Sequence, residues 1–189
     1  LCDILRGGTE VAEQANIPIL GGHTIIDKEP KYGMVVTGKV EKQFLTRNNT
    51  AKANDVLVLT KPLGTGIIST AIKHGSATKN IENVAIETMV TLNRSAANAM
   101  KTTKVSACTD VTGYGLLGHL LEMCEGSNVS AEINFTKVPF IDGVSDLALS
   151  DVIPGGTRKN LEFVNKSVEF SSDIQRHQKL MLADAQTSG

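Results

Sequence analysis

The segment that most constrains the fold is residues 109–123, which read TDVTGYGLLGHLLEM. A short apolar run precedes it, Asp110 stands between two threonines, and a Gly-x-Gly step leads into a leucine-rich stretch with helical spacing. This order predicts a strand, a tight loop and a helix, with a carboxylate at the mouth of the loop. Loop amides and a helix N-terminus favour anions, so such a place suits a hard metal ion together with a phosphate.

Composition excludes several other classes of protein. The chain has 189 residues, of which 41% are hydrophobic and 21% charged, a globular balance that allows one large or two small domains. A net charge of −1 gives no drive toward non-specific binding of nucleic acid or membranes. No apolar stretch reaches the ~20 residues of a membrane span, and no signal peptide is visible. The three cysteines lack zinc-site or redox spacing, which is typical of buried thiols in a reducing compartment.

The hydrophobic pattern predicts alternating strands and helices, which is an α/β to α+β fold class. We expect helices over residues 1–16, 67–74, 81–101, 114–125, 142–149 and 173–182. We expect strands, from their β-branched or alternating apolar residues, over residues 32–40, 56–60, 105–108 and 129–135. Polar residues 42–54 are the best candidate for a domain boundary, and residues 152–159 are expected to hold a Pro-Gly-Gly loop.

Asp110 has two interpretations from its surroundings alone. Magnesium usually takes one or two protein carboxylates and fills its other positions with water and phosphate oxygens, so one aspartate is chemically sufficient. Alternatively, Asp110 or either neighbouring threonine caps the N-terminus of the following helix. Gly113 and Gly115 fit both interpretations, since each allows close approach of the backbone.

A second glycine segment, Gly21-Gly22-His23, is equally open to two interpretations. Adjacent glycines after an apolar run let the backbone touch a ligand, and His23 could donate to a phosphate oxygen. The alternative is a tight turn with a solvated histidine.

Three further features have weaker signals. Residues 61–66 (KPLGTG) lack the Gly-Lys-Ser/Thr ending of a phosphate-binding loop, and we interpret them as a structural turn. Arg158 could reach a phosphate or could be an exposed residue near a helix start. His119 forms a His-x-x-Glu pair with Glu122, which is weak evidence for a transition metal, and we interpret it as a packing or capping residue.

Five segments together resemble one family, the selenophosphate synthetases (selenide, water dikinases). They are GGHTIIDKEPKYG (21–33), TKPLGTG (60–66), ACTDVTGYGLLGHLLEM (107–123), IPGGT (153–157) and DAQTSG (184–189). Their order and spacing follow that family over essentially the whole chain. Relatives in the same superfamily, such as aminoimidazole ribonucleotide synthetase, thiamine-phosphate kinase and the hydrogenase-maturation dehydratase, share the fold without combining the GGHT and TDVTGYGLLGH wording.

The resemblance implies a fold, an activity and site residues. The fold is the aminoimidazole-ribonucleotide-synthetase-like two-domain fold, with residues 1–46 ending an N-terminal ATP-binding domain and residues 47–189 forming an incomplete C-terminal α+β domain. The activity is a transferase (kinase) reaction of selenocysteine biosynthesis that makes selenophosphate from selenide, ATP and water and releases AMP and phosphate. The enzyme is a Mg²⁺-dependent cytoplasmic homodimer with ATP near the interface. Asp110 is the expected metal ligand, and Gly21, Gly22 and His23 are the expected ATP contacts.

The resemblance also implies what this chain lacks. The family's reactive Cys or selenocysteine, its neighbouring Lys and its other metal-binding aspartates precede the matched region, so we expect no catalytic residue here, and none of the three cysteines takes that role. We expect an internal fragment, truncated at both ends and inactive alone. Ala183-Asp184-Ala185 stands where the family usually has Cys-Asp-Pro or Phe-Asp-Pro. Two alternatives stay open: a superfamily enzyme acting on another substrate, and a non-catalytic nucleotide-binding homologue.

Overall fold

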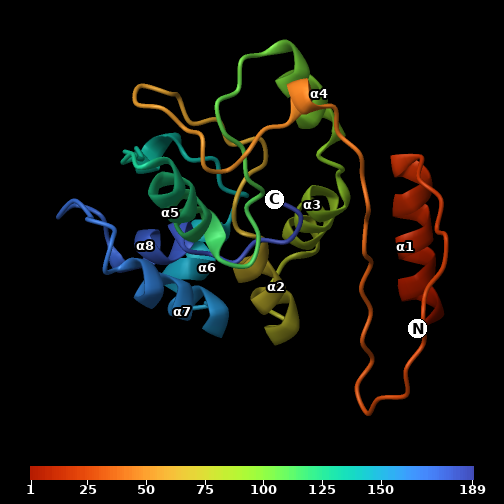
Figure 1. The fold of residues 1–189 in the computed structure, drawn as a ribbon. Coiled ribbons are helices and arrows are strands. Elements are labelled where there is room, and N and C mark those ends of the chain that lie inside the picture. The colour runs from red at the N-terminus through yellow and green to blue at the C-terminus, as the bar shows by residue number, and fades with distance from the viewer. The chain divides into compact units, whose positions relative to one another are not determined.

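The computed structural model describes all 189 residues, which form two compact units, Leu1–Leu45 and Thr46–Gly189. The first unit contains α1 (Cys2–Ala15) and the 3₁₀ turn η1 (Lys42–Phe44). The second contains α2 (Thr65–His74), α3 (Lys79–Val90), α4 (Arg94–Thr102), α5 (Gly115–Ser127), η2 (Phe135–Lys137), α6 (Val144–Leu149), α7 (Gly155–Val164) and α8 (Arg176–Leu182). Figure 1 shows some of these helices joined by short turns, such as α2 and α3, and others by long segments without regular secondary structure. The only β pairing is an isolated parallel bridge between Leu63 and Phe140.

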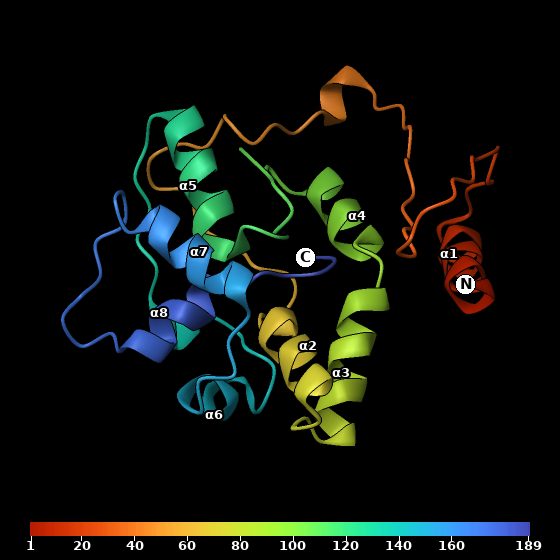
Figure 2. The same cartoon turned by 90° about the horizontal axis from the view of Figure 1, so that it is seen from below.

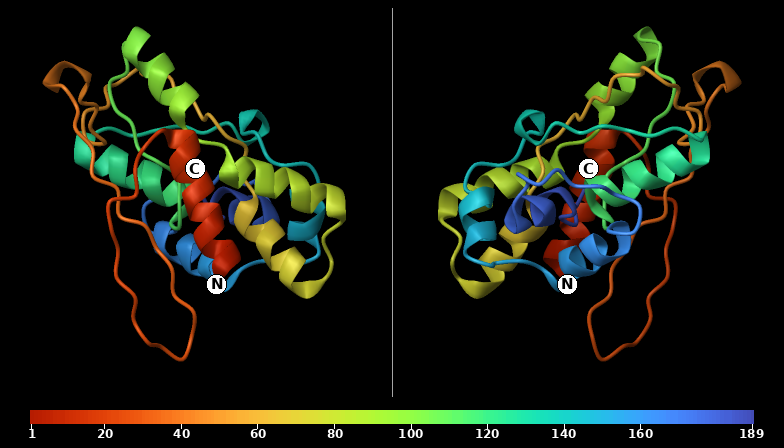
Figure 3. Two further views of the ribbon diagram at one scale, coloured as in Figure 1. Left: turned by 90° about the vertical axis from the view of Figure 1, so that its right-hand side faces the viewer. Right: turned by 90° about the vertical axis from the view of Figure 1, so that its left-hand side faces the viewer.

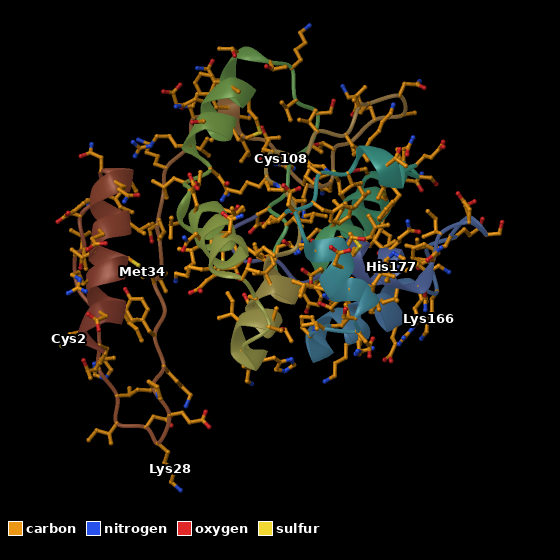
Figure 4. The ribbon with its side chains drawn as sticks, turned by 180° about the vertical axis from the view of Figure 1, so that it is seen from behind. Cys2, Lys28, Met34, Cys108, Lys166 and His177 are labelled. Atoms are coloured by element: carbon orange, nitrogen blue, oxygen red, sulfur yellow. The ribbon has the colours of Figure 1, made fainter.

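The first unit is one helix followed by an extended excursion of the chain. Helix α1 ends at Asn16, which adopts the left-handed conformation (φ 55°) and returns its N–H to the carbonyls of the last turn. Two extended arms, residues 17–26 and 31–41, follow the helix and meet at a tip (Figure 3). Lys28 lies at that tip (Figure 4). Tyr32 packs on the helix at Gly8, where a Cβ atom would lie 1.9 Å from the tyrosine oxygen.

The strand expected over residues 32–40 does not form, and this prediction is wrong for the structure described. The segment is extended, but no neighbouring segment of its unit provides a ladder of hydrogen bonds. Val35 is 98% exposed. A β-strand is stabilised by pairing and by one buried face, so β-branched composition alone leaves this segment extended and unpaired.

The second unit is built on two hydrophobic clusters that share helix α8 (Figure 2). The first cluster lies between α2, α3, α6 and α8, and its buried members include Ile67, Ile68, Ala85, Val144, Leu180 and Met181. The second lies between α5, α7 and α8, with Leu117, Val164, Leu182 and Ala183 buried. Each fully buried aliphatic side chain contributes roughly 1.5–3 kcal/mol. Because α8 contributes to both clusters, it fixes α5 and α7 relative to α2 and α3.

The three strands expected in this unit, over residues 56–60, 105–108 and 129–135, are also not formed. Residues 47 and 108 lie side by side through one hydrogen bond, from Cys108 N–H to the Arg47 carbonyl (3.0 Å), and no ladder follows. Val56 and Val58 are 85% and 80% exposed. These segments are extended but have no neighbouring strand to pair with. The sequence pattern indicated an extended backbone, and it could not show that a pairing partner was absent.

The single helix expected over residues 81–101 is two helices, α3 and α4, separated at Thr91. The Thr88 and Thr91 hydroxyls donate to the carbonyls of Val84 (2.8 Å) and Glu87 (2.7 Å), and Thr91 itself adopts an extended conformation. Threonine hydroxyls that compete for helix carbonyls weaken a helix at its end. The amphipathic spacing continues across the break, so periodicity could not reveal it.

The other expected helices form with shifts of one to three residues, and α7 is a helix that the sequence analysis did not predict. Helix α2 ends at Gly75 (φ 70°), as expected for a glycine C-cap. Helix α5 runs two residues past the expected end and is capped by Asn128 (φ 54°) rather than by a glycine. The expected Pro-Gly-Gly loop is partly wrong, because Gly155 begins α7 directly after Pro154. None of the helices combines the length and the apolar character that crossing a bilayer requires.

Candidate functional site

Asp110 lies in the loop between extended residues 105–109 and helix α5, and its carboxylate is exposed. The carboxylate takes part in no hydrogen bond or ion pair; only the main-chain oxygen of Asp110 is used, by the Thr109 hydroxyl (3.2 Å). Helix α5 begins at Gly115 with Tyr114 as its N-cap residue, and no side chain caps it. The capping interpretation of Asp110 and its threonines is therefore wrong, and the carboxylate is free to bind a cation.

The backbone after Asp110 is held firmly from other parts of the unit. The Thr112 carbonyl accepts the N–H groups of Gly115 and of Gln186, each at 2.9 Å. The Gly113 carbonyl accepts from the Asn160 side-chain amide at 2.8 Å. Residues far apart in the sequence thus fix a loop whose own carboxylate stays unengaged.

His119 lies against the same loop and packs as the sequence led us to expect. Its Nε2 atom is 3.3 Å from the Thr112 hydroxyl oxygen, and its ring meets Tyr114 edge-on with centroids 6.0 Å apart. Glu122, the other member of the His-x-x-Glu pair, accepts a hydrogen bond from the Asn48 amide (3.0 Å). No group of three or more His, Cys, Asp or Glu side chains is placed to hold a metal, so Asp110 offers one ligand without a second carboxylate beside it.

A buried carboxylate, Asp184, is the centre of the unit's polar interior. Its two oxygens accept from the backbone N–H groups of Gly66 (3.1 Å) and Ile67 (3.2 Å), the Thr157 hydroxyl (2.8 Å) and the Gln186 amide (3.0 Å). The first two donors belong to the first turn of α2, so Asp184 caps that helix from a distant part of the chain. Burial raises the pKa of Asp184 to about 6, against the opposing effect of these four donors.

Gln186 completes the contact with the start of α2. Its side-chain oxygen accepts from Gly64 N–H (3.0 Å), Thr65 N–H (3.2 Å) and the Thr65 hydroxyl (3.1 Å). Its amide nitrogen donates to the main-chain oxygen of Asp184 (2.8 Å) as well as to the carboxylate. Residues 61–66 are thus fixed by protein groups, which agrees with their interpretation as a structural turn.

Four of the five sequence motifs meet around Asp184 because two glycines let backbones touch. A Cβ atom on Gly66 would lie 2.3 Å from the Ala185 carbonyl oxygen. Gly115 has φ +71°, and a Cβ atom there would lie 2.6 Å from the Ala183 carbonyl oxygen. Sequence analysis did not predict that these motifs meet. The feature that could have indicated it is the presence of glycines in several motifs that resemble the same family.

The departure at Ala185 has a local explanation. Ala185 stands where the family usually has proline, and its N–H donates to the Thr157 hydroxyl oxygen at 3.2 Å. Proline has no N–H and could not form this bond. The alanine is therefore accommodated by a hydrogen bond within the buried polar group.

The nucleotide-binding candidates Gly21, Gly22 and His23 lie in the first unit. All three are exposed, and no turn forms there, so the tight-turn part of the alternative is wrong while the histidine is exposed as that alternative expected. Nothing lies within 4 Å of a Cβ atom built on either glycine. The space around this segment is open, so packing within the structure does not explain why both positions are glycine.

Cys108, Cys124 and Arg158 have no features of reactive or phosphate-binding groups. Cys2 is exposed and the other two cysteines are only partly buried, so the expectation of buried thiols is wrong for Cys2. Burial, followed by the nearby negative charge of Asp110, raises the pKa of Cys108, and burial raises that of Cys124. A raised pKa disfavours the thiolate that acts as a nucleophile. Figure 4 shows Cys108 in the second unit. Arg158 pairs with Asp151 at 3.0 Å, so its charge is already matched.

Comparisons with known proteins agree with the sequence motifs. The family model described as AIR synthase related protein, C-terminal domain, matches residues 52–154. "Selenide, water dikinase" of Myxococcus xanthus (strain DK1622) is 50% identical over 191 residues, covering 100% of this chain and 54% of the relative. The proteins with the same name from Carboxydothermus hydrogenoformans and Clostridioides difficile (strain 630) are 46% and 43% identical over 189 residues, covering 100% of this chain and 55% and 54% of the relatives.

The chain therefore spans about half the length of the curated relatives that it matches. The matches confirm the predicted resemblance and the predicted aminoimidazole-ribonucleotide-synthetase-like fold class. They do so although the described chain is helical with extended segments instead of paired strands.

Proposed function

Because the chain belongs to the AIR synthase related proteins, we propose that it is part of an enzyme that makes selenophosphate from selenide, ATP and water, with AMP and phosphate as the other products. The observation that carries this proposal is the similarity to selenide, water dikinases along the entire chain, at 50% identity to the first of them. The match includes the loop with Asp110, an acidic side chain that makes no hydrogen bond or ion pair and stands beside a firmly held backbone.

We propose Asp110 as a magnesium ligand of that enzyme. Its exposed carboxylate makes no hydrogen bond or ion pair within the protein, and carboxylate oxygens are the ligands that Mg²⁺ prefers. A bound Mg²⁺ would offset the charge of the ATP phosphates. Asp110 alone is too few ligands for a complete site, so the remaining ligands would come from ATP, water and other carboxylates of the whole enzyme.

We further propose that Gly21, Gly22 and His23 contact ATP. The open space around both glycines allows a ligand to approach the backbone closely. Residues 1–46 then end the ATP-binding domain and residues 47–189 form most of the C-terminal domain. A homodimeric, cytoplasmic enzyme with ATP near the dimer interface is the arrangement proposed for the whole protein, on the resemblance alone.

The decisive experiment is phosphorus NMR of the full-length enzyme with Mg·ATP, with and without selenide, under reducing anaerobic conditions. The proposal requires selenide-dependent appearance of AMP, phosphate and a selenophosphate signal. Release of ADP alone would point to a superfamily enzyme acting on another substrate. Folded protein that binds ATP without turnover would point to a non-catalytic homologue.

The role of Asp110 is tested by Asp110→Asn in the same full-length enzyme. Removing the charge from a metal ligand should lower turnover at least about 100-fold, because phosphoryl transfer depends on the bound cation. The matched control is Asp142→Asn, another exposed aspartate without side-chain contacts. Equal turnover in both variants, with unchanged Mg²⁺ dependence, would remove Asp110 from the site.

A further inference from the structure

Residues 184–189, which we call the clasp, lie between the loop that contains Asp110 and the loop that begins α2. Figures 1 and 2 both show this C-terminal segment inside the second unit, with helices on several sides. Gln186 contacts both loops at once: its N–H donates to Thr112, and its side chain accepts from Gly64 and Thr65. The clasp is therefore the structural link between the two loops.

The end of the clasp lies directly on the residue that follows Asp110. A Cβ atom built on Gly189 would lie 1.8 Å from the Val111 carbonyl oxygen, so only glycine allows this approach. The Asn93 amide donates to the Gly189 oxygen at 2.8 Å. Any movement of Gly189 thus changes the surroundings of the Asp110 backbone.

A single lysine fastens this end of the clasp. The Lys61 ammonium group donates to the Ser188 carbonyl (2.5 Å), the Ser188 hydroxyl (3.2 Å) and the Thr91 carbonyl (2.6 Å). An ammonium group has three donors, so all of them are used. None of these acceptors is a carboxylate, and Lys61 forms no ion pair. Its ammonium group is therefore bound by main-chain and hydroxyl oxygens alone.

The position of Lys61 also suits the end of helix α3. Thr91 is the residue that ends α3, and the last turn of that helix contains no basic residue. A cation at a helix C-terminus interacts favourably with the helix dipole and with the unpaired carbonyls. Lys61 provides this charge from outside the helix and ties the helix end to the clasp at the same time.

We propose that Lys61 is a positioning residue, which holds the clasp at Ser188 and through it sets the place of the loop that contains Asp110. Lys61 touches no reacting atom in this role. Lys61 limits the movement of Ser188 and Gly189, and Gly189 in turn packs against Val111. The hydrogen bond from Gln186 holds Thr112, the next residue of the loop. If Asp110 binds a metal ion, as proposed above, Lys61 should also affect the affinity for that ion. The coupling between Lys61 and the loop does not depend on the proposed function.

The test uses Lys61→Met in the full-length protein, with amide hydrogen exchange measured by NMR. Gln186 N–H bonds directly to Thr112 and reports on the contact between clasp and loop; Gly115 N–H reports on the loop itself. We expect exchange at both amides to become at least tenfold faster. Leu147 in α6 and Val168 after α7 are the reference amides and should not change. Lys73→Met is the matched control, since Lys73 is an exposed lysine near the C-terminus of α2.

Two outcomes would overturn the proposal: unchanged exchange at Gln186 and Gly115, or an equal increase at the reference amides, which would mean a general loss of stability. If Lys61→Met does not fold, Asn93→Ala is the second variant. It removes the hydrogen bond from Asn93 to the Gly189 oxygen and should raise the exchange rate of the Gln186 amide by about threefold.

Affinity for Mn²⁺, measured by titration calorimetry as a substitute for Mg²⁺, separates this proposal from the proposed function. A tenfold weaker Mn²⁺ affinity in Lys61→Met, with no change in Lys73→Met, supports the consequence for the metal. Absence of Mn²⁺ binding in the unmodified protein would contradict the metal role of Asp110, while the exchange data would still decide the role of Lys61.

Discussion

Two groups of glycines differ sharply in what surrounds them. Gly66 and Gly115 are in backbone contact with residues 183–185, and a methyl group on either would overlap a carbonyl oxygen. Gly21 and Gly22 have nothing within 4 Å of a Cβ position. The first pair is explained by the folded chain itself. The second pair is not, and a ligand that approaches the backbone is the explanation that we propose.

The comparison extends to polar groups. In the second unit, buried side chains such as Thr157, Asp184 and Gln186 are all engaged, and no buried side-chain nitrogen or oxygen lacks a hydrogen-bond partner. In the first unit Ala12 is the one buried residue. Contacts within the chain thus explain Gly66 and Gly115, whereas they give no reason for Gly21 and Gly22.

The largest expected effect is on folding, from Gly115→Ala. A left-handed conformation costs alanine about 1–2 kcal/mol, and the overlap with the Ala183 carbonyl adds about 1–3 kcal/mol. The free energy of unfolding should therefore fall by about 4 kcal/mol in urea denaturation. Gly113→Ala is the control in the same loop, because nothing lies within 4 Å of its Cβ position. Equal stability of the two variants would contradict the contact described here.

The next effect is a pH dependence that comes from Asp184. Its pKa is raised from 3.8 to about 6 by burial. Between these values the folded protein retains a proton that the unfolded chain has lost, so the free energy of unfolding falls as pH rises through this window. A difference of about two pH units corresponds to about 3 kcal/mol.

Asp184→Asn has no such proton, and it provides the comparison. From pH 4 to pH 7 the unmodified protein should lose roughly 2 kcal/mol of stability relative to this variant, because at pH 4 the unfolded carboxyl is already partly ionised. Exposed Asp146→Asn serves as the control and should show no comparable change. A difference between the protein and Asp184→Asn that stays constant with pH would mean that Asp184 titrates normally.

The smallest effect on folding is expected for Gly22→Ala. With open space around this position, the free energy of unfolding should change by less than about 0.5 kcal/mol. Under the proposed function, ATP affinity of the full-length enzyme should fall at least tenfold, measured by calorimetry. Gly38→Ala, an exposed extended glycine of the same unit, should leave ATP affinity unchanged. Unchanged affinity in Gly22→Ala would remove this segment from the nucleotide site.

Sequence analysis predicted most of the helices, but it missed α7 and the break between α3 and α4. Apolar spacing located α2 and α5. The break at Thr91 was missed because it depends on threonine hydroxyls and on the Lys61 contact, which lies 30 residues away. Spacing within a window cannot contain such information.

The same limit applies to the strands and to the site. β-Branched runs such as residues 56–60 indicate a preference for extended backbone, and pairing depends on a neighbour that periodicity does not supply. Asp110 was found because it stands inside a motif with a recognisable loop. Asp184 was quoted as part of a motif, but its burial arises from residues 66, 67 and 157, so its chemistry became visible only in three dimensions.

The capping of α2 by Asp184 has a consequence for how the chain is made. The N–H groups of Gly66 and Ile67 find their acceptor 118 and 117 residues later in the sequence. A ribosome that adds about 5–20 residues per second needs on the order of ten seconds to cover that distance. During this interval the start of α2 emerges without its cap, so chaperones and proteases meet an unfinished helix end that the completed chain conceals.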